Sequence, residues 1–211
     1  MNNSKPLTII GLVGKKQSGK DTTCKLLREM CVDRKIVRLA FADALKLEVA
    51  DIIYDEYGQY DLHGKLHEVD SLKTKLPEFR RLLQDYGSRM KSEHGPDYWI
   101  ARTAAQLSAL DCTQPTIIVI TDCRYANEAA WINSQGGVLW RIRRPDVDKE
   151  NTDTHSSETE LESISPDRIF YNSGDIKNYA GSIYLSIRHF KLTFGQNIKH
   201  YEDIDYEQTT K

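Results

Sequence analysis

A glycine-rich string that ends in a lysine is the part of this sequence best suited to chemistry. Residues 14–21 read GKKQSGKD, which fits the pattern GxxxxGK with Asp21 where Ser or Thr is usual. Glycines let successive backbone N–H groups face one anion, and a helix beginning near Lys20 would add the positive end of its dipole. The string therefore predicts a cradle for nucleotide phosphates, with Lys20 on the outer phosphates. The residues expected to contact these phosphates are Gly14, Lys16, Ser18, Gly19, Lys20, Asp21 and Thr22.

Oxygen-bearing side chains near this string and after a later apolar run are the candidate magnesium ligands. Asp122 comes directly after the run 117–121, the most apolar strand candidate, and an Asp there is typical of a magnesium anchor beside a phosphate loop. Asp21 would bind the ion through water, or Thr22 would bind it with its hydroxyl. Two structural alternatives stay open. Asp21 would complement the dipole of its helix, and Asp122 would cap the helix that follows it.

Arginines gather where two predicted strands leave the sheet. Arg124 follows the third predicted strand, and Arg141, Arg143 and Arg144 surround the end of the fourth. Phosphoryl transfer concentrates negative charge on the moving group, so arginines placed there would stabilise the transition state. The structural alternatives are an ion pair between Arg124 and Glu128 and a solvated run of charge. The candidate catalytic residues are Lys20, Arg124, Arg143 and Arg144.

A second group of polar and aromatic residues would suit the molecule that accepts a phosphoryl group. Arg80 and Gln84 lie one turn apart on a helix that begins at Pro77, so they share a face. This face would hold the phosphate and base of an acceptor together, or it is simply an exposed polar face. Trp99 would stack on a base, or it packs in the core.

Strands that alternate with helices would position these residues. Short apolar runs predict strands at residues 7–13, 36–41, 116–121, 138–142 and 169–171. Helical spacing and start signals predict helices at 20–32, from a cap at Asp43 onward, and at 77–91, 96–110, 125–134 and 179–190. The alternation predicts an α/β fold of three layers with a five-stranded parallel sheet. Ligands bind at the carboxyl ends of such strands, where most of the candidate residues lie.

Three polar stretches have no clear place in this pattern. Residues 58–75 and 144–165 lack apolar periodicity, so we expect both to leave the core, the first as a mobile excursion. The tail after Gly195 is acidic, and we expect it to fray.

Composition and charge exclude several classes of function. The 31 acidic and 29 basic residues give a net charge of −2, without the basic excess typical of proteins that bind nucleic acid. No apolar run approaches the roughly 18 residues of a membrane span, and residues 1–6 lack a signal-peptide pattern. The 4 cysteines form no CxxC pair, which predicts reduced thiols, no structural zinc and a cytoplasmic location.

Several strings, taken in order, resemble the deoxynucleoside monophosphate kinases of bacteriophages. The strings are KKQSGKDT from Lys15, FADALK from Phe41, LQDYG from Leu83, DYW from Asp97, DCRYANE from Asp122, RRP from Arg143 and DTHSSE from Asp153. The glycine-rich string alone is typical only of the P-loop superfamily. The string D-x-R-x-x-N-E, followed by R-P and D-x-H-x-S-E, is much narrower. The matches run from residue 9 to about residue 175, which is most of the chain.

This resemblance implies a fold, a reaction and a set of ligands. It implies a single P-loop kinase domain over residues 1–211 that uses ATP and Mg²⁺ to phosphorylate a deoxynucleoside monophosphate. It also implies an acceptor-binding helical region at 42–95 and a closing lid at 144–165. We expect no nucleic-acid or membrane partner, a homodimer, and the host cytoplasm as the location of a phage protein. The expected acceptor-binding residues are Asp43, Lys46, Arg80, Gln84, Trp99 and Arg124.

The chemistry of the acceptor separates the candidate functions. A monophosphate oxygen is already anionic at neutral pH, so transfer to it requires charge neutralisation and no general base. A hydroxyl acceptor would require a carboxylate base, a role that Asp43 could fill, so a kinase resembling dephospho-coenzyme A kinase stays open. A phosphomevalonate-kinase-like enzyme and a non-enzymatic nucleotide-binding module are further alternatives, although no N-K-x-D string for guanine recognition occurs. The base preference of the acceptor cannot be read from these residues.

Overall fold

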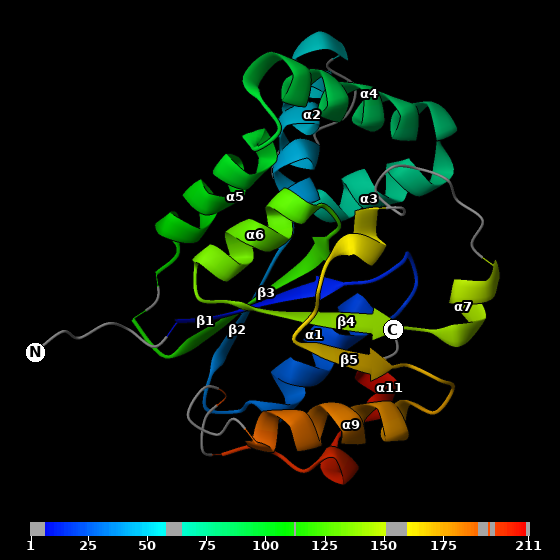
Figure 1. The fold of residues 1–211 in the computed structure, drawn as a ribbon. Helices are drawn as coiled ribbons and strands as arrows, with labels where there is room; N and C mark the ends of the chain where they lie inside the picture. The colour runs from blue at the N-terminus through cyan, green and yellow to red at the C-terminus, as the bar shows by residue number, and fades with distance from the viewer. Residues whose placement is uncertain are drawn as a thin grey trace, which may run out of the picture. The chain divides into compact units, whose positions relative to one another are not determined.

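The chain divides into two compact units, each with its own hydrophobic core. The computed structural model describes residues 7–57, 65–111, 113–150, 160–189, 194 and 197–209. The first unit comprises Met1–Leu39 and Asp111–Lys211, and the second comprises Ala40–Leu110 (Figure 1). The second unit therefore contains the whole region, 42–95, that was expected to bind the acceptor.

A five-stranded sheet forms the centre of the first unit. Its strands are β1 (Leu7–Val13), β2 (Lys35–Leu39), β3 (Thr116–Cys123), β4 (Val138–Arg143) and β5 (Arg168–Tyr171). Their order is β2-β3-β1-β4-β5, and every neighbouring pair is parallel. The predicted parallel sheet is confirmed, because runs buried on both faces of a sheet read as continuous apolar segments. β1 lies at the middle of the sheet, so the loop that follows it emerges at the centre of the carboxyl edge.

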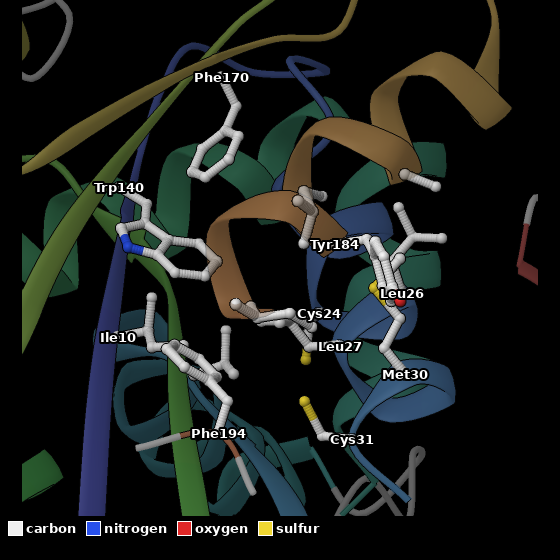
Figure 2. Close-up of a cluster of buried hydrophobic side chains, with 14 of the residues drawn as sticks. Ile10, Cys24, Leu26, Leu27, Met30, Cys31, Trp140, Phe170, Tyr184 and Phe194 are labelled. Atoms are coloured by element: carbon white, nitrogen blue, oxygen red, sulfur yellow. The ribbon is translucent and has the colours of Figure 1, made fainter. Parts of the chain in front are cut away.

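The strands bury alternate side chains on opposite faces of this sheet. Leu12, Trp140 and Phe170 join the core formed with α1 (Lys20–Met30) and α9 (Ile176–His189). In Figure 2, Trp140 lies beside Phe170 and Phe194, with ring centroids 5.0 and 5.7 Å away. On the other face, α6 (Ala126–Ser134) approaches so closely that a Cβ on Gly11 would lie 2.6 Å from Ile132 Cδ1. Helices on both faces give the three predicted layers (Figure 1).

The second unit is helical and packs around a small core. Its helices are α2 (Phe41–Tyr57), α3 (Leu66–Lys75), α4 (Pro77–His94) and α5 (Tyr98–Ala109). Val49, Val69, Phe79 and Leu83 are buried together. Asp43 lies in the first turn of α2 rather than at its cap, because the helix begins two residues earlier.

Residues 66–75 do not form the excursion that was expected. They form α3, which buries Val69 completely, while 58–64 lie outside the described residues. Val69, with the partly buried Leu72, anchors this polar helix in a core that neighbouring helices complete. The prediction of an excursion is therefore wrong for 66–75.

The C-terminal segment is also more ordered than its acidity suggested. Ile198 forms a β-bridge with Cys31, and the Lys199 N–H donates to the carbonyl of Met30 over 2.9 Å. Ile204, between η2 (Tyr201–Asp203) and α11 (Tyr206–Thr209), is buried in the main core. The expectation of fraying is wrong for 197–209, because these contacts join residues far apart in sequence.

The strand and helix boundaries mostly differ from those predicted by one to three residues. Within 144–165, α7 (Pro145–Glu150) and η1 (Leu161–Ser163) are described, whereas 151–159 lie outside the described residues. Cys24, Cys31 and Cys123 are free and buried, and Cys112 is not described. No helix among the described residues is long and apolar enough to cross a membrane.

Candidate active site

The loop that joins β1 to α1, residues 14–19, has a backbone that glycine makes possible. Gly19 adopts φ +108° directly before α1, a conformation that L side chains rarely adopt. A Cβ on Gly14 would lie 2.5 Å from the main-chain oxygen of Ile142 and 2.7 Å from Ser18 Oγ. The loop therefore requires glycine at both ends, which accounts for the spacing in the GxxxxGK pattern.

Ser18 points a polar atom into the interior of this loop. Its side chain is fully buried, and its Oγ has no hydrogen-bond partner in the part of the chain that the structure describes. A buried polar atom without a partner costs about 1–3 kcal/mol. An anion oxygen would accept the hydroxyl hydrogen, so the loop fits a phosphate group.

Lys20 concentrates positive charge at the same loop. The residue is buried, and its Nζ donates to the carbonyls of Gly14 and Lys15, each over 2.7 Å. Lys20 is also the first residue of α1, so its main-chain N–H lies at the positive end of the helix dipole. Ammonium and dipole act together on any anion that the loop holds.

The candidate magnesium ligands differ in their surroundings. Val13 pairs with Cys123 in the parallel register, so Asp122 lies beside the start of the 14–19 loop and is half-buried. Thr22 is half-buried on α1, whereas the Asp21 side chain is 78% exposed and its carboxylate lies 3.7 Å from Arg38 Nε. No group of three or more acidic, histidine or cysteine side chains among the described residues could hold a metal. Magnesium commonly takes only one or two carboxylates and completes its shell with water and phosphate oxygens, so these residues fit it.

The start of α6 is stabilised by Glu128. Glu128 Oε2 accepts hydrogen bonds from the main-chain N–H groups of Arg124 and Tyr125, over 2.7 and 3.1 Å. The helix begins at Ala126. Glu128 therefore binds two backbone donors directly before the helix, one of them the N–H of Arg124, which is half-buried.

Two arginines of β4 share one carboxylate oxygen. Glu162 Oε2 accepts from Arg141 Nη1 and from Arg143 Nη2, both over 2.8 Å. The Arg141 side chain is 5% exposed, and its Nη2 also donates to the carbonyls of Leu161 and Ile164, over 2.7 and 2.6 Å. Arg141 thus fastens residues 161–164 to the sheet, where the sequence suggested a contact with the moving phosphoryl group.

The other arginines of the cluster remain accessible. The Arg143 side chain is 33% exposed, and Arg144, directly beyond the strand, is exposed. Because Arg143 and Arg144 follow the carboxyl end of β4, they lie at the edge of the sheet where ligands bind. Both side chains are accessible to solvent, as the expected catalytic role would require.

Asn172 belongs to this site, although the sequence analysis passed over it. Its Nδ2 donates to the Ser18 carbonyl over 3.0 Å, and its main-chain N–H donates to the Arg143 carbonyl over 2.7 Å. Asn172 directly follows β5, so its place at the carboxyl edge was a signal that could have been used. Its partner in the loop could not be foreseen, since the two residues are 154 positions apart.

In the second unit, Lys46 is held between two carboxylates. Its buried Nζ lies 3.2 Å from Asp43 Oδ1 and 3.0 Å from Asp70 Oδ1. Asp43 and Lys46 were both expected to bind the acceptor, and the structure brings them together on the first turns of α2. Asp70, on α3, was not foreseen, because residues 58–75 were read as an excursion.

The other expected acceptor residues separate into exposed and buried groups. Arg80 and Gln84 are both exposed on α4, one turn apart, so their side chains are accessible to a ligand. Trp99 is buried, its Nε1 donates to the Gly87 carbonyl over 3.2 Å, and its ring lies 4.8 Å from that of Tyr98. This arrangement favours the core-packing alternative for Trp99 over stacking on a base.

A cluster centred on Glu48 was missed by the sequence analysis. The Glu48 carboxylate accepts from the hydroxyls of Tyr86 and Tyr98, over 3.1 and 3.2 Å, and lies 2.8 Å from Arg102 Nε. Burial, and secondarily the bond to Glu48, raises the pKa of Tyr86. These contacts join α2, α4 and α5, and no sequence spacing links residues so far apart.

A parallel sheet whose central strand leads through a glycine-bounded loop into a helix is the arrangement of the P-loop nucleotide-binding fold. Within this fold, the family model for deoxynucleotide monophosphate kinase matches residues 54–183, more than half of the 211 residues. The chain belongs to this family.

Three known proteins are similar to this chain. A protein of Acanthamoeba polyphaga mimivirus named "Putative deoxynucleotide monophosphate kinase" is 29% identical over 192 residues, covering 84% of this chain and 94% of its own. Two solved structures are similar at low identity. Dephospho-CoA kinase from Campylobacter jejuni has a TM-score of 0.44 and 13% identity, covering 87% of this chain and 97% of its own. Shikimate kinase from Aquifex aeolicus has a TM-score of 0.45 and 15% identity, covering 88% and 99%.

Proposed function

We propose that this protein transfers the γ-phosphoryl group of ATP to a deoxynucleoside monophosphate, giving the diphosphate and ADP. The observation that carries the proposal is the 14–19 loop, in which the buried Ser18 hydroxyl has no partner among the described residues and the Lys20 ammonium donates to the loop carbonyls of Gly14 and Lys15. Membership of the deoxynucleotide monophosphate kinase family supports the choice of acceptor.

Different residues of the first unit would bind the phosphates of ATP and stabilise the charge that develops during transfer. The loop N–H groups and Lys20 would hold the β- and γ-phosphates, and Arg124, Arg143 and Arg144 would neutralise charge that develops during transfer. Asp122, with Thr22 or Asp21, would hold Mg²⁺, whose charge would offset that of the phosphates. Asp21 is the weaker candidate, since its carboxylate is exposed and directed at Arg38.

The second unit would bind the acceptor. Its exposed Arg80 suits a bidentate contact with a phosphate, and Gln84, one turn away, both donates and accepts hydrogen bonds. Asp43 is less suited to act as a general base for a hydroxyl acceptor, because Lys46 Nζ already engages its carboxylate. Its surroundings therefore favour a phosphate acceptor, which requires no base.

The Lys20→Ala variant tests the donor half of the proposal. Removing one contact to transition-state charge lowers the rate about 10²- to 10³-fold. The variant should still fold and unfold cooperatively, at a somewhat lower temperature, because two hydrogen bonds to loop carbonyls are lost. ADP release is measured with each deoxynucleoside monophosphate and without one. Lys177→Ala, an exposed lysine on α9, is the matched control and should retain full activity. Lys20→Ala with more than about a tenth of the activity would overturn the assignment of the loop.

The Arg80→Lys variant tests the acceptor half. A lysine keeps the charge but cannot reproduce two parallel bonds to a phosphate, so the acceptor KM should rise about tenfold or more while the ATP KM stays unchanged. Arg81, also exposed on α4 but turned about 100° away, provides the control. An acceptor defect in Arg81→Lys alone would show that the other arginine binds the phosphate.

A further inference from the structure

Asn172 makes two directed contacts that converge on the candidate phosphate loop. Its side-chain amide donates to the carbonyl of Ser18 over 3.0 Å. Its main-chain N–H donates to the carbonyl of Arg143 over 2.7 Å, which extends the pairing of β4 with β5 beyond Tyr171. One residue therefore joins the loop to the strand end that carries Arg143.

The bond to Ser18 fixes the direction of a whole peptide unit. The described residues contain no cis peptide bond, and in a trans peptide the C=O and the N–H point in opposite directions. Holding the Ser18 carbonyl toward Asn172 therefore directs the N–H of Gly19 away from Asn172. If this peptide flipped, a carbonyl oxygen would replace an N–H donor in the loop, and a phosphate would be repelled there.

Gly19 supplies the space that this contact needs. A Cβ on Gly19 would overlap Asn172 Nδ2 and would also come within 3.4 Å of its Cγ. The positive φ of Gly19 already disfavours a side chain. Asn172 adds a second, independent reason for glycine, one that no sequence pattern around residue 19 reveals.

We propose that Asn172 is a positioning residue for the donor nucleotide: it holds the Ser18–Gly19 peptide with its N–H toward the triphosphate and ties that peptide to the strand end of Arg143. The proposal rests on the proposed function, in which this loop binds ATP. Asn172 acts through the loop backbone and contacts no reacting atom.

Binding of AMP-PNP with Mg²⁺, measured by calorimetry without an acceptor, tests this role. Loss of one hydrogen bond in Asn172→Ala should weaken binding about threefold to tenfold. Asn172→Asp should weaken it further, because the isosteric carboxylate cannot donate to the Ser18 carbonyl and repels it. Asn133→Ala, an exposed asparagine on α6, is the control and should bind like the wild type.

Steady-state kinetics separate positioning from a general structural effect. The ATP KM should rise in both Asn172 variants while the KM for the deoxynucleoside monophosphate stays within about twofold of the wild type. Gly19→Ala should cost less binding in the Asn172→Ala background than in the wild type, because one of its two penalties is gone. Equal costs in the two backgrounds would show that the contact does not matter.

The outcomes distinguish this role from the function on which it rests. If the wild type binds AMP-PNP and the folded Asn172→Asp variant binds it equally well, the positioning role is refuted and the kinase proposal stands. If ATP and acceptor KM rise together with a lower melting temperature, Asn172 is only structural. If the wild type itself does not bind AMP-PNP, the loop is not an ATP site and both proposals fall.

Discussion

Two arginines two positions apart on β4 should separate stability from catalysis. Arg141 donates to Glu162 Oε2 over 2.8 Å and to the carbonyls of Leu161 and Ile164 over 2.7 and 2.6 Å. Arg141→Met removes all three bonds and leaves these acceptors of the 161–164 segment without this donor. Arg143, by contrast, donates to Glu162 from a half-exposed position.

The expected magnitudes follow from this difference in burial. Leaving a buried acceptor without its donor costs about 1–3 kcal/mol. The buried carbonyls of Leu161 and Ile164 both lose their donor, whereas the half-exposed Glu162 keeps Arg143, so we expect Arg141→Met to lower the free energy of unfolding by about 3–5 kcal/mol. The figure is not larger, because Arg141 Nε is already buried without a partner among the described residues. Arg143→Met should cost at most about 1 kcal/mol, as exposed ion pairs do, but should lower kcat about 10²- to 10³-fold.

Urea unfolding and steady-state kinetics on the same preparations provide the assay. A loss of 3–5 kcal/mol is large beside a total stability of about 5–15 kcal/mol, so Arg141→Lys, which keeps the charge and part of the bonding, gives a milder second variant. Arg141→Met as stable as the wild type would refute the anchoring role. Arg143→Met that destabilises equally would refute the separation of the two arginines.

Three further outcomes are expected. Gly14→Ala should abolish AMP-PNP binding in a titration, because its Cβ would lie 2.5 Å from the main-chain oxygen of Ile142; retained binding would contradict the tight loop. Burial raises the pKa of Cys31 to about 12 from 9.0, so the folded state holds this proton more tightly. The free energy of unfolding should therefore fall above about pH 9, by up to about 1.4 kcal/mol per pH unit from this thiol. Urea midpoints should fall with it, and Cys31→Ser should show a smaller fall. Val69→Ala should cost about 2 kcal/mol in urea unfolding, whereas Leu82→Ala, exposed on α4, should cost little; equal costs would contradict the burial of α3.

The strands and most of the helices could be predicted because their signals are local. A strand covered on both faces needs an unbroken apolar run, and 116–121 has one. The helix from Lys20 shows its apolar side chains at helical spacing. Such patterns do not depend on the rest of the chain, so the order of elements followed from them.

The missed features depend on contacts between distant segments. Val69 and Leu72 join α3 to a core that other helices complete, and Ile198 pairs with Cys31, which is far away in the sequence. The sequence indicated arginines at the end of β4 but not which of them Glu162 and the 161–164 carbonyls would bury. Composition and periodicity do not reveal such pairings.

In the candidate site, too, residues with a local sequence signal could be predicted and residues that depend on a distant partner could not. The loop glycines and Lys20 were readable because a phosphate cradle needs those residue types at fixed spacing. Asn172 was not, because a lone asparagine after a short strand becomes significant only when its partner, the Ser18 carbonyl, is known.

Direct detection of the phosphorylated product tests the central claim most sharply. The wild-type protein is incubated with ATP labelled at the γ-phosphate, Mg²⁺ and each of the common and modified-pyrimidine deoxynucleoside monophosphates, and the products are separated by chromatography. We expect label in the diphosphate of at least one of these nucleotides, and none with Lys20→Ala. Label that stays out of every nucleotide tested, while ATP is hydrolysed or a hydroxyl acceptor such as dephospho-coenzyme A is phosphorylated, would contradict the account.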